Sequence, residues 1–129
     1  MLQWIKKLCY HIGGGVIPQN SEAFICGKEV KMIEVHVNYY FKNNDDRDKF
    51  YKEAGDAGII AASKNEPGNI RYDYYIPMDT DAKIYLLEQW RDQEALDIHS
   101  AAEHFAALQG IKAKYVINFE RVQYDGVDE

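Results

Sequence analysis

The clearest pattern in the chain is a strict alternation of apolar and polar residues over positions 33–41, which read IEVHVNYYF. The odd positions are aliphatic or aromatic, and the even positions carry Glu34, His36, Asn38 and Tyr40. Successive side chains of a strand point to opposite faces, so this period of two predicts a β-strand. Its apolar face should pack against helices, which leaves His36 and Asn38 on the other face.

The residues that follow predict a helix that ends near Lys64. The run Asn43-Asn44-Asp45-Asp46 can cap the first amides, and its acids suit the positive end of the helix dipole. Apolar residues then recur at helical spacing between Phe50 and Ala61. Glu66-Pro67-Gly68 breaks regular structure, so the helix should stop before it.

Two further alternating stretches, 69–76 and 83–90, predict strands. The short turn between them indicates an antiparallel hairpin. In the second of these strands, Glu88 and Trp90 share the face that also carries Ile84 and Leu86.

Helical spacing returns after Asp92, which can cap a short helix through His99. Ser100 and Glu103 have the spacing of a capping box, which predicts a second helix that restarts at Ser100 and ends at Gly110. This helix carries His104 and Phe105. A last strand is predicted over 112–124, followed by an acidic tail at 125–129.

The predicted order is strand, helix, strand, strand, helix, strand. With right-handed crossovers this order gives an α+β, ferredoxin-like βαββαβ fold, with four antiparallel strands and the helices on one face of the sheet. The other face is left bare and is too rich in tyrosine and aliphatic residues to stay in water. We therefore expect a homodimer packed sheet to sheet, in the manner of a dimeric α+β barrel.

Composition narrows the class of protein. The 129 residues suit one domain, and no apolar run is long enough for a membrane span. The formal charge of −6 argues against a nucleic-acid partner. Both cysteines lie in residues 1–31, which we expect to be an extension outside a domain at 32–124, with Met32 a candidate natural start. A domain without cysteines fits a reducing compartment, so we expect a cytoplasmic protein.

Two motifs resemble those of a known family. Residues 66–72, EPGNIRY, resemble the E-x-G-x-x-x-Y/F motif at the start of the second strand in antibiotic biosynthesis monooxygenase domains. Glu88-Gln89-Trp90, followed by His99 and His104, resembles the E-x-W…H…H signature of the same family. The resemblance covers residues 32–124 and implies a dimeric α+β barrel. The superfamily includes quinol monooxygenases, haem-degrading members and a sugar-phosphate isomerase.

The resemblance implies a cofactor-independent monooxygenase that acts on a small aromatic, quinol-like or phenol-like substrate with O₂. In that chemistry the substrate supplies the electrons, and the protein supplies a base, donors for the developing oxyanion and a dry pocket. We expect His99 to be the base or a proton relay, assisted by Glu88, with His36 as a second candidate base. The remaining expected site residues are the oxyanion holders Asn38 and Tyr72, the stacking residue Trp90, and His104 and Phe105 beside the substrate.

Each of these residues also has a purely structural interpretation. Trp90 can be a packing anchor, and the two helical histidines can be satisfied core residues. His99 and His104 are five residues apart, which places them ~140° apart on a continuous helix, so only a break at Ser100 would bring them together.

No metal or other cofactor is expected. His99 and Glu103 could chelate only with a third ligand such as His36 or Glu34, and no H-E-x-x-H spacing is present. The haem-degrading members resemble this chain at Asn38 and Trp90, but their iron-binding histidine falls near Gln109. The chain has neither a G-x-G-x-x-G loop nor a recognisable nucleophile motif.

Two other functions remain open. One is an isomerase of the same superfamily that acts on a small carbonyl compound, although a phosphorylated substrate would need a basic cavity, for which the predicted strands offer only Arg71 and Arg121. The other is a non-enzymatic, dimeric ligand-binding or stress protein.

Overall fold

The computed structural model describes residues 31–126, so the expected extension at 1–31 and the last residues of the expected acidic tail lie almost wholly outside it. The described elements, in chain order, are β1 (Ile33–Phe41), α3 (Asn44–Asp56), α4 (Ile59–Lys64), β2 (Asn69–Tyr75), β3 (Lys83–Trp90), α5 (Gln93–Ser100), α6 (Glu103–Tyr115) and β4 (Val116–Asp125).

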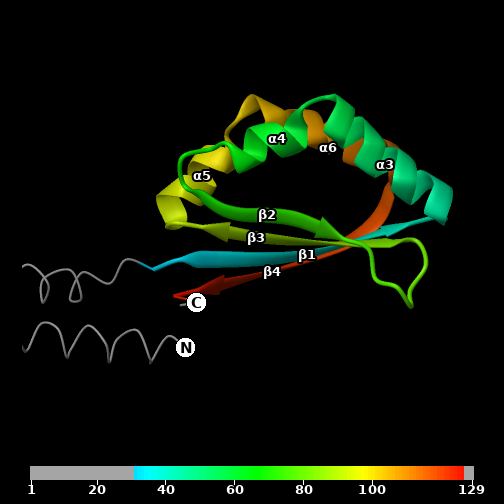
Figure 1. The fold of residues 1–129 in the computed structure, drawn as a ribbon, viewed down its shortest axis with the longest axis horizontal. Coiled ribbons are helices and arrows are strands. Elements are labelled where there is room, and N and C mark those ends of the chain that lie inside the picture. The colour runs from blue at the N-terminus through cyan, green and yellow to red at the C-terminus, as the bar shows by residue number, and fades with distance from the viewer. Residues whose placement is uncertain (1–30, 127–129) are drawn as a thin grey trace, which may run out of the picture.

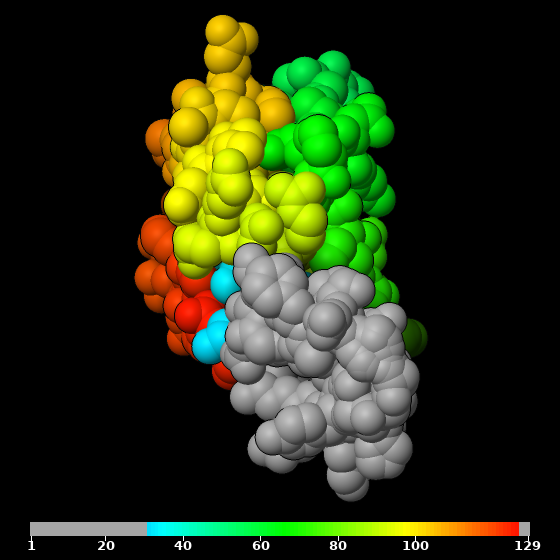
Figure 2. Space-filling view, turned by 90° about the vertical axis from the view of Figure 1, so that its left-hand side faces the viewer, coloured from blue at the N-terminus to red at the C-terminus, as the bar shows by residue number. Residues whose placement is uncertain are grey.

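The strands form one antiparallel sheet in the order β2-β3-β1-β4. All four helices lie on the same face of this sheet (Figure 1). This arrangement confirms the predicted ferredoxin-like α+β fold and the predicted hairpin between β2 and β3. Figure 2 shows the end of the molecule at which α5 lies between the α4 side and the edge strand β4.

The core forms where the apolar face of β1 meets the helices. Its five odd-numbered side chains are buried and its four even-numbered ones are not, as the alternation predicts. Phe50 of α3 packs its ring against Tyr39 and Phe41 at centroid distances of 5.5 and 5.4 Å. Leu96 of α5 and Leu108 of α6 are buried in the same layer. Burial of each such side chain contributes about 1.5–3 kcal/mol to folding.

The first predicted helix is present but divided. Asn43 is its N-cap, since its side-chain oxygen accepts from the Asp46 amide at 2.8 Å. Gly58 has a left-handed backbone, with φ at 79°, and this separates α3 from α4. The helical region ends at Lys64, as predicted.

The second helical region begins with the predicted cap, Asp92, but the helix that carries His104 departs from the prediction at both ends. Ser100 does not start a helix: it closes α5, and its hydroxyl donates to the Leu96 carbonyl at 3.1 Å. The next helix, α6, begins at Glu103 and runs through Gly110 to Tyr115, so the predicted stop at Gly110 and the strand start at 112 are wrong. The final turn of α6 is held by α3, because Lys114 and Tyr115 both donate to the Glu53 carboxylate.

The end of the last strand, β4, is held against the beginning of the first strand, β1. The strand β4 extends to Asp125, and the Gly126 amide donates to the Met32 carbonyl at 2.9 Å. Within residues 31–126, no helix has both the length and the apolar character that a membrane crossing requires.

Candidate functional site

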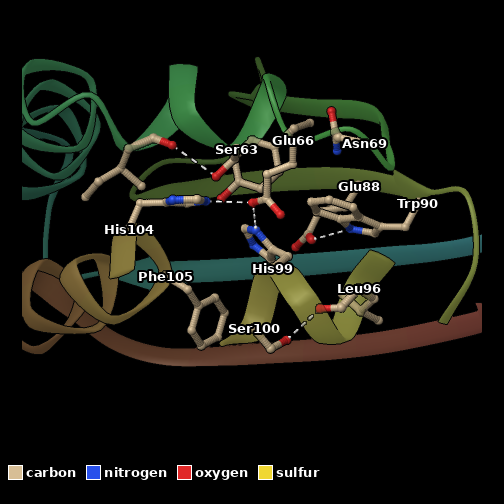
Figure 3. A network of polar contacts seen from close by, with 12 residues as sticks. Ser63, Glu66, Asn69, Glu88, Trp90, Leu96, His99, Ser100, His104 and Phe105 are labelled. Atoms are coloured by element: carbon tan, nitrogen blue, oxygen red, sulfur yellow. Dashed lines mark hydrogen bonds and ion pairs between the residues drawn. The ribbon is translucent and has the colours of Figure 1, made fainter. Parts of the chain in front are cut away.

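Two histidine side chains from separate helices meet at Glu66, which lies in the turn between α4 and β2 (Figure 3). His99 Nδ1, on α5, and His104 Nε2, on α6, each lie 2.6 Å from Glu66 Oε2. An ionised carboxylate can only accept hydrogen bonds, so both rings donate an N–H to this oxygen. The remaining nitrogen of His99, Nε2, then keeps its lone pair.

The break between α5 and α6 allows both histidines to reach Glu66. The residues Ala101 and Ala102 separate the two helices, so the ~140° offset of a continuous helix does not apply. The Glu66 turn is itself held against the link between β3 and α5, where the Arg91 amide donates to the Gly68 carbonyl at 2.8 Å. A Cβ on Gly68 would lie 2.3 Å from Ala95 Cβ, so only glycine allows this approach.

The His99 ring is enclosed by aromatic side chains and is 3% exposed. It stacks on the Trp90 indole with ring centroids 4.6 Å apart and planes tilted by 32°. Tyr72 and Phe105 present ring edges at 5.7 and 5.4 Å. These contacts fix the ring, so the expected grouping of His99, His104, Trp90, Tyr72 and Phe105 is present in the fold.

Glu88 lies next to His99 in a dry environment. It is buried, and its Oε1 accepts from Trp90 Nε1 at 2.9 Å. Burial raises the pKa of Glu88, and the Trp90 hydrogen bond offsets this only in part. Tyr72 is also buried, and burial raises the pKa of its hydroxyl. Both groups therefore favour the protonated form and can donate hydrogen bonds.

A cavity of about 70 Å³ opens beside these groups, between the sheet and the helices. Most of its wall is apolar or aromatic, while Glu88 and His99 lie on it together with two basic side chains, Lys112 and Arg121. Burial lowers the pKa of the Lys112 ammonium. The lining residues are Val37, Tyr39, Tyr72, Glu88, His99, Phe105, Leu108, Gln109, Lys112, Phe119 and Arg121.

Asn38 and His36 are not part of this cluster, and the expectation that Asn38 would meet His99 and Trp90 is wrong for the single chain. The apolar residues beside them in β1 point to the helices, so both side chains lie on the opposite face of the sheet. His36 is instead held between Glu34 and the Tyr85 hydroxyl, at 2.6 and 2.7 Å. The cavity lies on the helix side of the sheet, not on the bare side.

Two residues of the site, Glu66 and Lys112, have no site role in the sequence-based expectation. Glu66 is part of the quoted motif, but its pattern predicts only the end of a helix. Lys112 falls in the wrongly predicted last strand. Of the two arginines considered for a basic cavity, Arg121 lines it and Arg71 does not. For Glu66 the available signal is the pair of histidines downstream, which need an acceptor because His99 is buried and His104 is partly buried.

Glu66, His99 and His104 could also hold a metal ion. Their three donor atoms lie within 4.8 Å of one another, and two imidazoles with one carboxylate suit a divalent transition metal. Within the described residues, these three atoms are joined by the two hydrogen bonds from the histidines to Glu66 Oε2. This trio differs from the set considered from sequence, because Glu34 and His36 lie across the sheet.

The residues present do not fit a haem group. The resemblance places the iron-binding histidine of haem-degrading members near position 109, and the residue that lines the cavity there is Gln109. The cavity of about 70 Å³ is also far below the ~300–1,000 Å³ of typical ligand pockets.

Comparison with known proteins places the chain in a family. The profile for the family described as antibiotic biosynthesis monooxygenase matches residues 32–110. A curated relative, "Putative monooxygenase YcnE" of Bacillus subtilis (strain 168), is 32% identical over 68 residues. That match covers 53% of this chain and 66% of YcnE, just under two thirds of its length.

Solved structures agree with this placement. A structure from Nitrosomonas europaea, described as a "putative antibiotic biosynthesis monooxygenase", superposes with a TM-score of 0.66 at 25% identity, covering 74% of this chain and 90% of that one. PA3566 from Pseudomonas aeruginosa shares the fold, with a TM-score of 0.65 at 22% identity over 74% of this chain and 94% of its own. Because the family profile covers more than half of the sequence, including Glu66, Trp90, His99 and His104, the chain belongs to the antibiotic biosynthesis monooxygenase family.

Proposed function

We propose that this protein is a cofactor-independent monooxygenase that oxidises a small, electron-rich phenol or quinol with O₂. The observation that carries the proposal is the geometry of His99. Its Nδ1–H is held by the buried Glu66 carboxylate, its ring is stacked on Trp90, and it lines the cavity. A buried imidazole in a fixed tautomer, with its other nitrogen free, is suited to act as a general base.

The first step is proton abstraction. His99 Nε2 takes the proton of a substrate hydroxyl, which leaves a phenolate whose ring carbon next to the C–O⁻ group is electron-rich. Glu66 stabilises the imidazolium that forms, because its carboxylate already accepts the Nδ1–H at 2.6 Å. The Tyr72 hydroxyl can donate to the phenolate oxygen, since burial keeps this phenol protonated by raising its pKa.

The second step transfers electrons to O₂. The ring carbon forms a C–O bond to O₂, and the resulting peroxide takes up a proton. Loss of the ring C–H proton to a base then provides the electron pair that breaks the O–O bond, and the departing oxygen leaves as water after a second protonation. For hydroquinone the balance is hydroquinone plus O₂ giving hydroxybenzoquinone plus water. Glu88 is the acid suited to protonate the peroxide, because burial favours its neutral form.

The same pair of groups favours one alternative, an isomerase of small carbonyl compounds. A base and a neutral carboxylic acid on the wall of one cavity can move a proton between carbon and oxygen without an oxidant. The volume of about 70 Å³ suits a substrate smaller than an aromatic ring. The basic groups that this alternative requires are present as Lys112 and Arg121.

Oxygen uptake with hydroquinone tests the proposal, in a buffer that contains a chelator and no flavin. We expect uptake, incorporation of one ¹⁸O atom from labelled O₂ into the product, and a rate that falls ~10²–10⁴-fold in His99→Gln, the usual contribution of a positioned base. A rate unchanged in His99→Gln would contradict the assignment of the base. Activity that disappears with the chelator would instead point to a metal at Glu66, His99 and His104.

Two further results separate the alternatives. Under argon, deuterium exchange from solvent into a small α-hydroxy ketone, lost in His99→Gln, would favour the isomerase. Binding of hydroquinone with neither oxygen uptake nor exchange would favour a ligand-binding protein.

A further inference from the structure

Two basic side chains face the cavity from different walls. Lys112 comes from α6 and Arg121 from the edge strand β4. The Lys112 ammonium lies over the rings of Phe119 and Tyr39, at 4.5 and 5.2 Å from their centroids. The guanidinium of Arg121 donates to Gln123 Oε1 at 3.0 Å. Across residues 31–126, neither cation has a carboxylate within ion-pair distance.

Lys112 and Arg121 differ in this from most of the other lysine and arginine side chains within residues 31–126, which do form ion pairs. Other cations pair readily: Lys49 with Asp45, Lys52 with Asp56, and Lys114 with Glu53. The acidic side chain on the cavity wall, Glu88, accepts from Trp90 Nε1 and is not within ion-pair distance of either cation. Within the described residues the cavity therefore presents two basic side chains that have no carboxylate in direct contact.

The positions of these charges give the cavity a direction. Tyr72 and His99, the groups that handle the hydroxyl, are at most 3% exposed and mark its closed side. Lys112 is only half-buried and Arg121 is exposed, so they mark the side that opens to solvent. A ligand whose hydroxyl reaches His99 must place its opposite end near the two cations.

The volume supports the same orientation. A closed apolar cavity of ~150 Å³ can hold benzene, and this one measures about 70 Å³, roughly half of that. An aromatic ring can therefore enter only in part, and a substituent opposite the hydroxyl stays at the mouth. Phe105 and Phe119 line the cavity and can contact the faces of the ring.

We propose that this cavity selects a single-ring phenol or quinol that carries a carboxylate on the side away from its reactive hydroxyl. Arg121 can bind the carboxylate through two parallel N–H donors, and Lys112 adds a second positive charge. The proposal rests on the proposed function for the role of the hydroxyl. The charge preference itself depends only on binding.

The test compares two ligands that differ by one carboxylate, hydroquinone and 2,5-dihydroxybenzoate. Their affinities are measured by calorimetry under argon, so that binding does not depend on turnover. We expect the carboxylated ligand to bind at least about tenfold tighter to the native chain, a difference that shrinks as salt screens the charges. In the double variant Lys112→Met, Arg121→Gln the preference should fall below about threefold. Arg71→Gln is the matched control, because Arg71 lies on β2, pairs there with Asp73 and is outside the cavity lining.

Several results would overturn the proposal. Equal affinity for the two ligands, or a preference that survives the double variant, would show that Lys112 and Arg121 do not bind the carboxylate. Tighter binding of dihydroxyacetone phosphate than of 2,5-dihydroxybenzoate would assign the charges to a small phosphorylated carbonyl compound. A carboxylate preference without oxygen uptake would leave this proposal standing and contradict only the oxygenase.

Discussion

The unprotonated nitrogen of His99 depends on a hydrogen bond that the other ring nitrogen makes to a residue distant in the sequence. Glu66 is 33 residues away, and its side chain, 10% exposed, accepts from both histidines through one oxygen. Its other oxygen, Oε1, is buried and has no hydrogen-bond partner within the described residues. The position of the carboxylate therefore depends on the two imidazoles, and the tautomer of each imidazole depends on the carboxylate.

Replacement of Glu66 by glutamine tests this dependence at the residue scale. The amide keeps the shape but loses the charge that stabilises the imidazolium. We expect kcat to fall by about 10–100-fold with little change in KM, the effect of losing support for a base and not a substrate contact. Nitrogen NMR should show that the fraction of His99 with its proton on Nδ1 decreases. Glu94→Gln, at an exposed position of α5 outside the cavity lining, is the control and should change neither property.

Glu88 gives a prediction about pH and stability. Burial raises its pKa in the folded protein, so the fold favours the protonated form. The stability that this contributes is complete below the ordinary carboxyl pKa and is lost as the pH rises through the raised value. Each unit by which the pKa is raised costs the ionised form about 1.4 kcal/mol.

Glu88→Gln should therefore be more stable than the native chain near pH ~8, and equal to it near pH ~4. Glutamine preserves an oxygen that can accept from Trp90 Nε1, so the packing changes little. Urea unfolding at several pH values measures the difference, and subtracting the two proteins cancels the other titrating groups. A variant that is less stable at every pH would show that the ionised carboxylate is a favourable partner of Lys112 and Arg121.

At the scale of elements, the site depends on how closely the Glu66 turn approaches α5. Gly68 makes this approach possible, while Gly110 lies in α6 with open space around the position of a Cβ. The two glycines therefore respond oppositely to the same substitution. Gly68→Ala forces a Cβ against Ala95 and should cost about 1–3 kcal/mol, as overpacking does. Gly110→Ala should stabilise α6 by about 0.5–1 kcal/mol.

Thermal unfolding of both variants measures these effects. If Gly68→Ala is tolerated without loss, the contact between the turn and α5 does not hold the site. A destabilising Gly110→Ala would mean that α6 requires glycine for a reason other than helix propensity.

At the scale of the whole molecule, the uncovered face of the sheet carries apolar groups beside its polar network. Val122 and Tyr124 of β4 are 47% and 49% exposed, next to His36 and Glu34 of β1 in the sheet register. Such a surface favours association with a second copy, and the fold family of this chain makes a homodimer through the sheet our expectation.

Sedimentation of the full chain should give about 30 kDa, twice the 14.9 kDa of one chain. Val122→Glu places a charge in the apolar part of this face and should shift the protein toward monomer at micromolar concentration, with an unchanged circular dichroism spectrum. Met78 is fully exposed in the turn between β2 and β3, so Met78→Glu should leave the dimer intact. If the native chain sediments as a monomer, the sheet face is not a dimer interface.

Local patterns were sufficient for the order of the elements, for the face on which each β1 and β3 side chain lies, and for the ferredoxin-like topology. The reason is physical: a period of two along a strand is a property of consecutive residues, and chain order with right-handed crossovers restricts how four strands can join. The motif around Glu88, Trp90, His99 and His104 likewise identified most of the side chains that meet in the site.

Other features arise only when distant segments pack together. Helix α6 passes Gly110 because Glu53, about sixty residues earlier, holds its last turn. The break between α5 and α6 was predicted at Ser100 and lies at Ala101 and Ala102, but no local pattern shows that it lets both histidines reach Glu66. Asn38 was expected in the site with His99 and Trp90, but its side chain lies on the face of the sheet away from the helices, and the cavity lies on the helix side. The space between two packed layers is set by side chains from every element at once, so it cannot be read from any single stretch of the chain.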